Sequence, residues 1–265
     1  LNECSNAKQC WFADDAAGVG QLQELKVWWD VLNDVGPSIG YLPNAKKCWL
    51  ITKTDREEMA RTVFAGTAVN ISSQGQRHLG AVLGSREYFE EYVNGKVEEW
   101  VSEVAKLSEF ATTEPQASYV AFMFGLKHKW TYFLRTLPDI EEMLIPLERA
   151  VADLLIPSIT GHSCTHEERE LLALPVRMGG LGLVNPCQVA TSEYEASINV
   201  TTPLVQKIIS QDQTLPDAAE IRTVELRARK EKEDCLKGKL EDVKRSLPAK
   251  TNRAVELAVE KGASS

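Results

Sequence analysis

The sequence predicts an α+β fold, in which a small partial sheet with packed helices precedes a mainly helical region. Three observations lead to this prediction. Short apolar runs alternate with helical patterns up to about residue 84, apolar residues then recur at helical spacing to about residue 160, and the chain ends in a long charged helical pattern. Of the 265 residues, 43% are hydrophobic and 26% are charged, which is typical of a globular protein and excludes a disordered one.

The first region, residues 1–84, combines apolar runs of strand length with stretches in which apolar residues recur every three or four positions. Gly36-Pro37 is expected to stop the first helix, and Thr54-Asp55 to begin the second. The predicted elements are a strand at 9–12, a helix at 18–33, a strand at 48–51, a helix at 54–64, and a hairpin of 69–71 and 79–83 around residues 73–75.

The second region, residues 85–160, is predicted to be helical. Its first helix carries an apolar stripe at spacings of three and four, which consists of Phe89, Val93, Val97, Trp100, Val104 and Leu107. Residues 119–134 are apolar on nearly every side, which predicts a central helix against which the stripe packs. A third helix is expected at 140–155, with Pro146 as a kink.

The third region, residues 161–265, contains a glycine-rich loop at 174–183, and short helical pieces are expected after it. From Asp217 onward a charged helical pattern, broken near Pro248, is expected to be a solvated helix, with a coiled-coil surface as the alternative. This tail has a small excess of basic residues, although the net charge of the whole chain is −8. An acidic body does not attract a phosphate backbone, so any nucleic-acid role must come from a local site.

The cysteine pattern and the hydropathy predict an intracellular protein, in the cytoplasm or the nucleus, without a membrane partner. The 6 cysteines form no C-x-x-C pair, which argues against a zinc ribbon or a redox motif. No apolar run approaches the roughly 20 residues that span a bilayer, and the first residues lack the pattern of a signal peptide. The chain opens on Leu rather than Met, which hints that it begins inside a longer sequence.

Asp14 and Asp15 are the most informative candidate ligands. Two adjacent carboxylates at the tip of a strand-turn-strand repel each other, and a bound divalent cation removes that repulsion. Mg²⁺ takes one or two carboxylates together with substrate phosphates. The alternative is a solvated turn, because Asp is a favoured turn residue.

The order of the motifs resembles the palm and thumb of a reverse transcriptase, the RNA-directed DNA polymerase of retroelements. In that family an aromatic-Ala-Asp-Asp turn precedes a helix, a Gly…Asn-x-x-Lys segment, a Leu-Gly hairpin called the primer grip, and a helical thumb. The matching segments here are, in order, Phe12-Ala13-Asp14-Asp15, the helix at 22–32, residues 40–47, His78-Leu79-Gly80 and the helix at 89–107. Residues 174–182 also look like a segment found downstream of the polymerase domain in some retroelements.

The resemblance implies a function and a site. Residues 1–84 would be a partial palm, 85–160 a thumb-like region, and 161–265 a connection loop with a charged helical tail. The activity would be nucleotidyl transfer by two-metal catalysis, with Mg²⁺ (or Mn²⁺) as cofactor and an RNA template, a DNA primer and deoxynucleotides as partners. Asp14 and Asp15 would bind the metal, and Lys47 would lie near the phosphates of the incoming nucleotide as a candidate proton donor. His78, Leu79 and Gly80 would hold the primer end.

The chain also departs from the family pattern. The family needs a further Asp from an earlier palm strand, together with fingers residues, and only 11 residues precede Phe12. We therefore expect the chain to be inactive alone. A non-catalytic retroelement-derived interaction protein is the alternative. A third interpretation, an unrelated metal-dependent enzyme that uses Asp14 and Asp15, is not supported by any third ligand that the sequence pattern identifies. Outside this series of motifs, Lys47 would be a surface lysine and His78 a turn histidine.

Two further patterns are weaker. His162-x-Cys164-x-His166 alternates three possible ligands, but metal sites usually add a fourth, so a polar loop is expected. The Gly-Gly-Leu-Gly run at 179–182 lacks the preceding strand and the downstream acid of a dinucleotide site. It predicts a flexible connection or a tight turn rather than a phosphate-binding loop.

Overall fold

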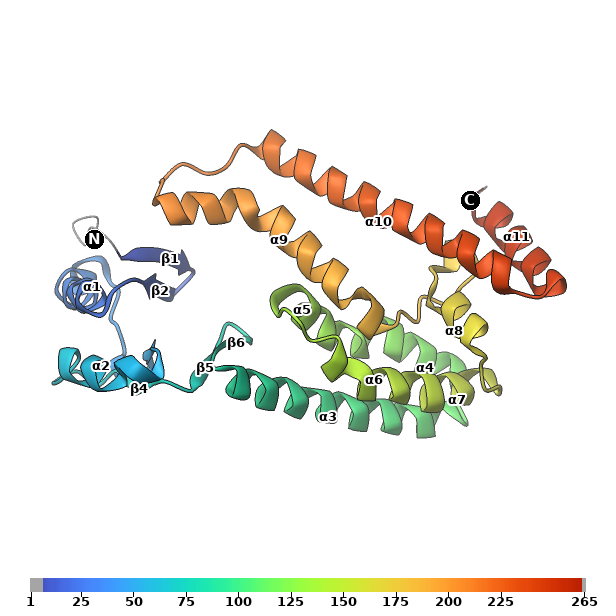
Figure 1. Cartoon of the computed structure of the whole chain (residues 1–265), viewed down its shortest axis with the longest axis horizontal. Helices are drawn as coiled ribbons and strands as arrows, with labels where there is room; N and C mark the ends of the chain where they lie inside the picture. Colours follow the sequence, from blue (N-terminus) through green and yellow to red (C-terminus); the bar gives the residue numbers. More distant parts are fainter. Residues whose placement is uncertain (1–6, 264–265) are drawn as a thin grey trace. The chain divides into compact units, whose positions relative to one another are not determined.

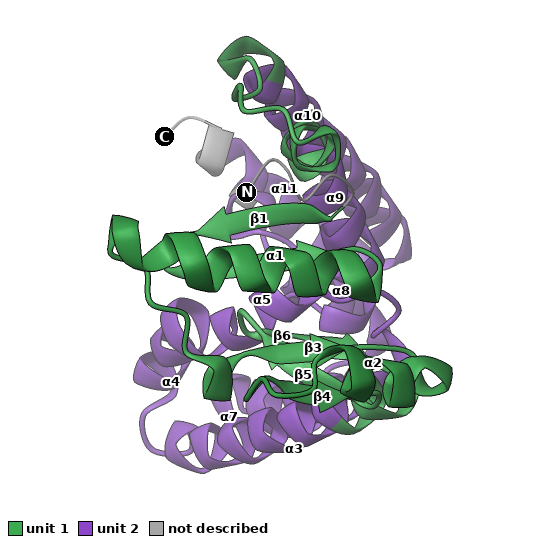
Figure 2. Ribbon diagram, turned by 90° about the vertical axis from the view of Figure 1, so that its left-hand side faces the viewer, with its two compact units in different colours: residues 1–91, 201–220 green, residues 92–200, 221–265 purple. Residues whose placement is uncertain are grey.

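The structure, a computed structural model, describes residues 7–263 and confirms the α+β class (Figure 1). The chain is 68% helical, and the strands of the described part form sheets of two strands each. Residues 1–91 and 201–220 make one compact unit, and residues 92–200 and 221–265 make the other (Figure 2). The second segment of the first unit therefore follows long after its first segment, and it interrupts the second unit between residues 200 and 221.

The first unit contains the elements β1 (Lys8–Phe12), β2 (Asp15–Val19), α1 (Leu22–Val35), β3 (Trp49–Ile51), α2 (Glu57–Val63), β4 (Asn70–Ser72), β5 (Gly75–His78) and β6 (Ala81–Gly84). Strands β1 and β2 pair antiparallel, β3 and β4 pair parallel, and β5 and β6 pair antiparallel. Helix α2 supplies the crossover that a parallel pair requires.

Helix α1 joins two small cores of the first unit through adjacent tryptophans. Trp28 packs in a cluster with Ala7 and Leu32. Trp29, on the neighbouring face of the helix, packs in a second cluster with Leu50, Ala60 and Phe64. Neighbouring residues on a helix point about 100° apart, so two consecutive large side chains can serve two cores. The predicted helix at 18–33 is thus confirmed, with its start moved to Leu22 because residues 15–19 form β2.

The predicted hairpin around residues 73–75 is wrong. Strand β4 pairs with β3, and the hairpin is formed by β5 and β6 around Leu79 and Gly80. Both turn residues have positive φ, 46° for Leu79 and 84° for Gly80. A two-residue turn with two left-handed positions matches the twist of the flanking strands, so this turn rather than the one at 73–75 closes the hairpin.

The second unit is built from helices, and three of them, α3, α9 and α10, have one end in the first unit. The helical elements, given in full, are α3 (Arg86–Ala111), α4 (Pro115–Ala121), the π-helical turn η4 (Phe122–Leu126), α5 (His128–Thr136), α6 (Ile145–Ala150), the π-helical turn η6 (Val151–Leu155), α7 (Ile156–Thr160), α8 (His166–Ala173), α9 (Pro186–Ser210), α10 (Ala218–Ser246) and α11 (Ala249–Ala263). None of the described helices is long and apolar enough to cross a membrane.

The predicted stripe on α3 forms part of the core. Val93, Val97, Trp100 and Val104 are buried, while Phe89 and Leu107 at the ends are half-buried. The Trp100 ring lies 4.9 Å from the ring of Phe133 and 5.9 Å from that of Trp130, both on α5. The predicted packing of the stripe on the segment 119–134 is therefore confirmed.

Three helix predictions need correction. Residues 119–134 are divided among α4, η4 and α5, and Phe124 in η4 is 80% exposed, so the segment is not a central helix. The wider π turn rotates the following residues relative to an α-helix, which takes some apolar side chains out of the core. Pro146 does not kink a helix; it lies in the first turn of α6, where its missing N–H costs nothing. Helix α9 has 25 residues and replaces the short pieces expected there.

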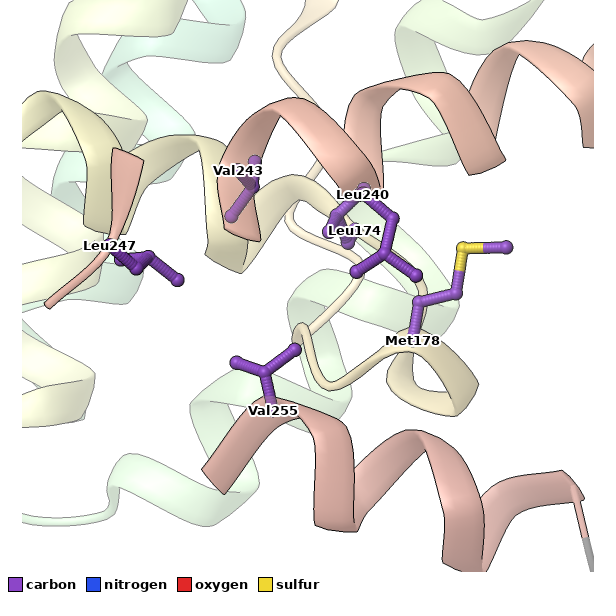
Figure 3. Packing of buried hydrophobic residues seen from close by; sticks show 6 residues of the cluster. All are labelled: Leu174, Met178, Leu240, Val243, Leu247 and Val255. Carbon is purple, nitrogen blue, oxygen red and sulfur yellow. The ribbon is translucent and has the colours of Figure 1, made fainter. Parts of the chain in front are cut away.

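The tail consists of α10 and α11, separated near Pro248 as predicted, but it is not wholly solvated. Leu240, Val243, Leu247 and Val255 from this tail form a buried cluster with Leu174 and Met178 of the glycine-rich loop (Figure 3). The tail is thus a structural part of the second unit.

The loop at 174–183 is a tight turn. The N–H groups of Leu181 and Leu183 both donate to the carbonyl of Leu172, at 3.2 and 3.0 Å. The hydroxyl of Tyr119 on α4 donates to the carbonyl of Leu181 at 2.7 Å. The backbone groups of this segment are therefore used for internal hydrogen bonds, which supports the tight turn over a flexible connection.

Candidate functional site

The candidate site lies at the tip of the β1–β2 hairpin, as the sequence predicts. The strand register closes at Phe12 opposite Asp15, so the turn consists of Ala13 and Asp14 alone. Ala13 has a φ of 53°, a left-handed conformation that costs a residue with a side chain about 1–3 kcal/mol. Both carboxylates are exposed, and Phe12 beside them is 70% exposed. The hairpin therefore presents two acidic groups and an aromatic ring together.

Tyr41 supports this tip from the following segment. Its hydroxyl donates a hydrogen bond to the backbone carbonyl of Asp14 at 3.2 Å, and its ring meets that of Trp11 edge-on, with 5.0 Å between the ring centres. Burial raises the pKa of Tyr41, and the negative charges of Cys48, Asp15 and Asp14 raise it further. Tyr41 lies in the segment 40–47 that follows the first helix in the predicted series of motifs, but only Lys47 of that segment was predicted to join the site, since a lone tyrosine before Leu-Pro carries no periodic signal.

Lys47 ends the short 3-10 helix at Ala45–Lys47, and its side chain is exposed. It follows Tyr41 on the same segment, but within the described residues no ion pair links it to Asp14 or Asp15. Its predicted position on the carboxylate side of the sheet stays a prediction.

The three predicted primer-binding residues lie on the β5–β6 hairpin. His78 is the last residue of β5 and is half-buried, and Leu79 and Gly80 form the turn. This hairpin belongs to the same compact unit as the Asp turn but to a separate sheet. The backbone of Leu79 is left-handed, a conformation that leaves its side chain 49% exposed at the tip.

The acidic residues do not complete a two-metal site. In residues 7–263 no group of three or more His, Cys, Asp or Glu side chains is arranged to hold a metal ion. Two carboxylates from one turn are fewer than two divalent cations need, since each takes about six ligands and a shared clamp requires bridging groups. Asp14 and Asp15 alone therefore do not make a two-metal site, and their role as metal ligands stays a prediction.

The other candidate ligands have structural roles. His162 Nε2 lies 3.0 Å from Glu168 Oε2, and Thr165 caps helix α8 by accepting a hydrogen bond from the Glu168 N–H. In return, the N–H of Thr165 donates to the carboxylate of Glu168 at 2.9 Å, which completes a capping box. The polar loop predicted for residues 162–166 therefore serves as the start of α8.

No family model, no curated protein and no solved structure matches this chain.

Proposed function

We propose that this chain is the C-terminal part of the palm, with the thumb and connection, of a retroelement reverse transcriptase that acts inside the cell. The observation that carries the proposal is the Asp14–Asp15 hairpin, whose tip is held by Tyr41 from the Gly-Tyr-Leu-Pro-Asn segment that the family places next in the chain. The primer-grip motif then falls on a hairpin turn, and a long helix with a buried stripe follows it.

In this proposal three groups of residues have separate roles, in binding the metal, the nucleotide phosphates and the primer. Asp14 and Asp15 supply two of the acidic ligands for Mg²⁺ or Mn²⁺, and the upstream palm supplies another. Lys47 stabilises negative charge on the phosphates of the incoming deoxynucleotide and can give a proton to the departing pyrophosphate. His78, Leu79 and Gly80 hold the end of the DNA primer on the RNA template.

Primer extension tests this proposal. Residues 1–265 alone are expected to extend no DNA primer on an RNA template with Mg²⁺ and deoxynucleotides, because the acidic ligand set is incomplete. The protein that also carries the upstream palm and fingers should extend the primer, and Asp14→Asn should abolish this activity. Asp34→Asn, which removes an exposed carboxylate from α1, is the matched control and should retain it. Extension that survives Asp14→Asn would refute the assignment of this turn.

A non-catalytic interaction protein derived from a retroelement is the second candidate. The observation that favours it is the incomplete acidic cluster in the described residues. The same experiment separates the two functions. A longer protein that folds and binds primer–template but does not extend the primer, with or without Asp14→Asn, would favour the interaction protein.

A further inference from the structure

Residues 201–220 return to the first unit after more than one hundred residues of the second (Figure 2). They include the last turns of α9, which ends at Ser210, and the connection to α10. In this connection Gln211 is the residue that reaches the strand preceding the Asp turn.

The side-chain amide of Gln211 occupies the edge of β1. Its Oε1 accepts a hydrogen bond from the N–H of Gln9 at 3.2 Å, and its Nε2 donates to the carbonyl of Gln9 at 3.0 Å. Phe12 and Asp15 flank a two-residue turn and form a hydrogen-bonded pair. Hydrogen-bonded and non-hydrogen-bonded pairs alternate along an antiparallel ladder, so Gln9, three residues before Phe12, belongs to a non-hydrogen-bonded pair and its N–H and C=O point away from β2. The amide of Gln211 therefore bonds to β1 as the peptide group of a third strand would.

The backbone of Gln211 is held in a conformation that glutamine rarely adopts. Its φ is 55°, which is left-handed, at a position just after a helix where Gly or Asn is usual. The N–H of Asp212 closes this helix end by donating to the carbonyl of Lys207 at 3.0 Å. A glycine would fit this backbone better, but the Gln211 amide makes two contacts that glycine lacks. Its Nε2 donates to the carbonyl of Ile208 in the last turn of α9 at 2.5 Å as well as to the carbonyl of Gln9, so it ties the helix end to β1.

Gln9 is also the residue through which β1 is fixed to α1. The side-chain Oε1 of Gln9 accepts hydrogen bonds from Trp28 Nε1 at 3.0 Å and from Trp11 Nε1 at 3.2 Å. Its backbone is bound by Gln211, and the carbonyl of Asp14 in the turn, five residues further on, is bound by Tyr41. The hairpin is thus held at its outer edge by Gln211 and at its tip by Tyr41.

We propose that Gln211 is a positioning residue for the Asp14–Asp15 turn, which it acts on by holding the outer edge of β1 from the segment that follows the thumb-like region. This inference rests on the proposed polymerase function. If it holds, residues beyond 200 help to position Asp14 and Asp15 in addition to forming the connection to α10.

Three variants of residues 1–265 test the contact itself. Gln211→Gly relieves the left-handed strain but removes the amide, Gln211→Ala removes the amide only, and Gln213→Ala is an exposed glutamine control two residues away. Amide hydrogen exchange followed by NMR should show the Gln9 N–H exchanging about fivefold faster in both Gln211 variants, which is the factor that corresponds to one lost hydrogen bond of about 1 kcal/mol. The control should match the wild type.

A second readout separates positioning from stability. In Gln211→Gly the NMR chemical shifts of Asp14 and Asp15 should move although the thermal midpoint is unchanged or higher. Phe64→Leu, which loosens the separate cluster around Trp29, should lower the midpoint without moving these shifts. Unchanged exchange of Gln9 in Gln211→Gly, or unchanged Asp14 and Asp15 shifts, would overturn the inference.

The longer polymerase completes the test. Gln211→Gly should lower primer extension by about tenfold, since catalytic groups must be held in place. Normal extension by this variant, in a protein that Asp14→Asn inactivates, would overturn the role of Gln211 and leave the proposed function standing. Extension that Asp14→Asn does not reduce would instead refute the proposed function, while the exchange of Gln9 would still report the contact itself.

Discussion

Gly180→Ala should destabilise the second unit strongly, because no space exists for a methyl group at this position. An ideal Cβ on Gly180 would lie 2.5 Å from the carbonyl oxygen of Leu171 and still closer to that of Leu174. Both are backbone atoms, so the chain itself must move. Leu174 is 2% exposed and belongs to the cluster that holds the tail, so the movement would enlarge or displace that core.

The size of the effect follows from these contacts. Inserting a methyl group into a packed core costs about 1–3 kcal/mol, and sometimes more. We expect at least about 3 kcal/mol here, because the obstruction is backbone on two sides and cannot be relieved by a change of rotamer.

Gly95→Ala is the matched control within the same unit. Gly95 lies inside α3, and an added Cβ would meet nothing within 4 Å. Alanine favours a helix over glycine by about 0.8–1.0 kcal/mol, so this variant should be more stable than the wild type. The same chemical change is thus expected to have opposite signs at two positions.

Urea unfolding followed by far-UV circular dichroism measures both changes, and hydrogen exchange localises them. In Gly180→Ala, faster exchange should be concentrated in α8 and in the tail that packs on residues 174–178. A stability within about 0.5 kcal/mol of the wild type would refute the packing described for this loop. Destabilisation by Gly95→Ala would show that α3 is not exposed at that residue.

Three further predictions concern single groups. Trp100→Ala should cost about 3–5 kcal/mol in urea unfolding because its ring packs on Phe133, and a loss within error would contradict that contact. Lys207 and the N–H of Thr214 lower the pKa of Asp212 to about 2, so Asp212 stabilises the fold above its usual pKa and loses this effect as the pH falls through about 2. An NMR titration of Lys207→Met should return the midpoint toward the usual value, and an unchanged midpoint would contradict the ion pair. Burial raises the pKa of Cys187 to about 11, so iodoacetamide at pH 8 should react about 100-fold more slowly than with an ordinary thiol, and equal rates would refute this.

Local patterns predicted the elements whose cause lies within a few residues. The stripe on α3 was predictable because each member is three or four residues from the next, and the structure buries its central members. The position of Asp14 and Asp15 at a hairpin tip was predictable because a polar pair directly follows a short apolar run.

Other elements depend on backbone conformations that residue types do not reveal. Leu79 adopts a left-handed φ that is unusual for leucine, so the pattern of apolar and polar residues did not place the hairpin turn there, and only the resemblance to a Leu-Gly hairpin pointed to it. Phe124 belongs to an apolar stretch but lies in the π turn and is 80% exposed, whereas Phe122 in the same turn is 1% exposed, a difference that hydrophobicity alone does not reveal. In both cases tertiary packing decides between local conformations of similar energy.

In the candidate site, too, contacts between residues close in sequence were predictable and those between distant residues were not. The two carboxylates are neighbours in sequence, and Tyr41 lies within the next motif of the chain, so this part of the site could be approached from the sequence. Gln9 and Gln211 are separated by 202 positions, and a glutamine in a polar connection is ordinary in composition. Closing a loop of this length costs only slightly more entropy than closing one of half the length, so distance along the chain does not disfavour the contact. A contact between residues this far apart leaves no periodic pattern in the sequence by which it could be predicted. The hydrogen bonds by which Gln211 holds the edge of β1 could therefore be found only in the structure.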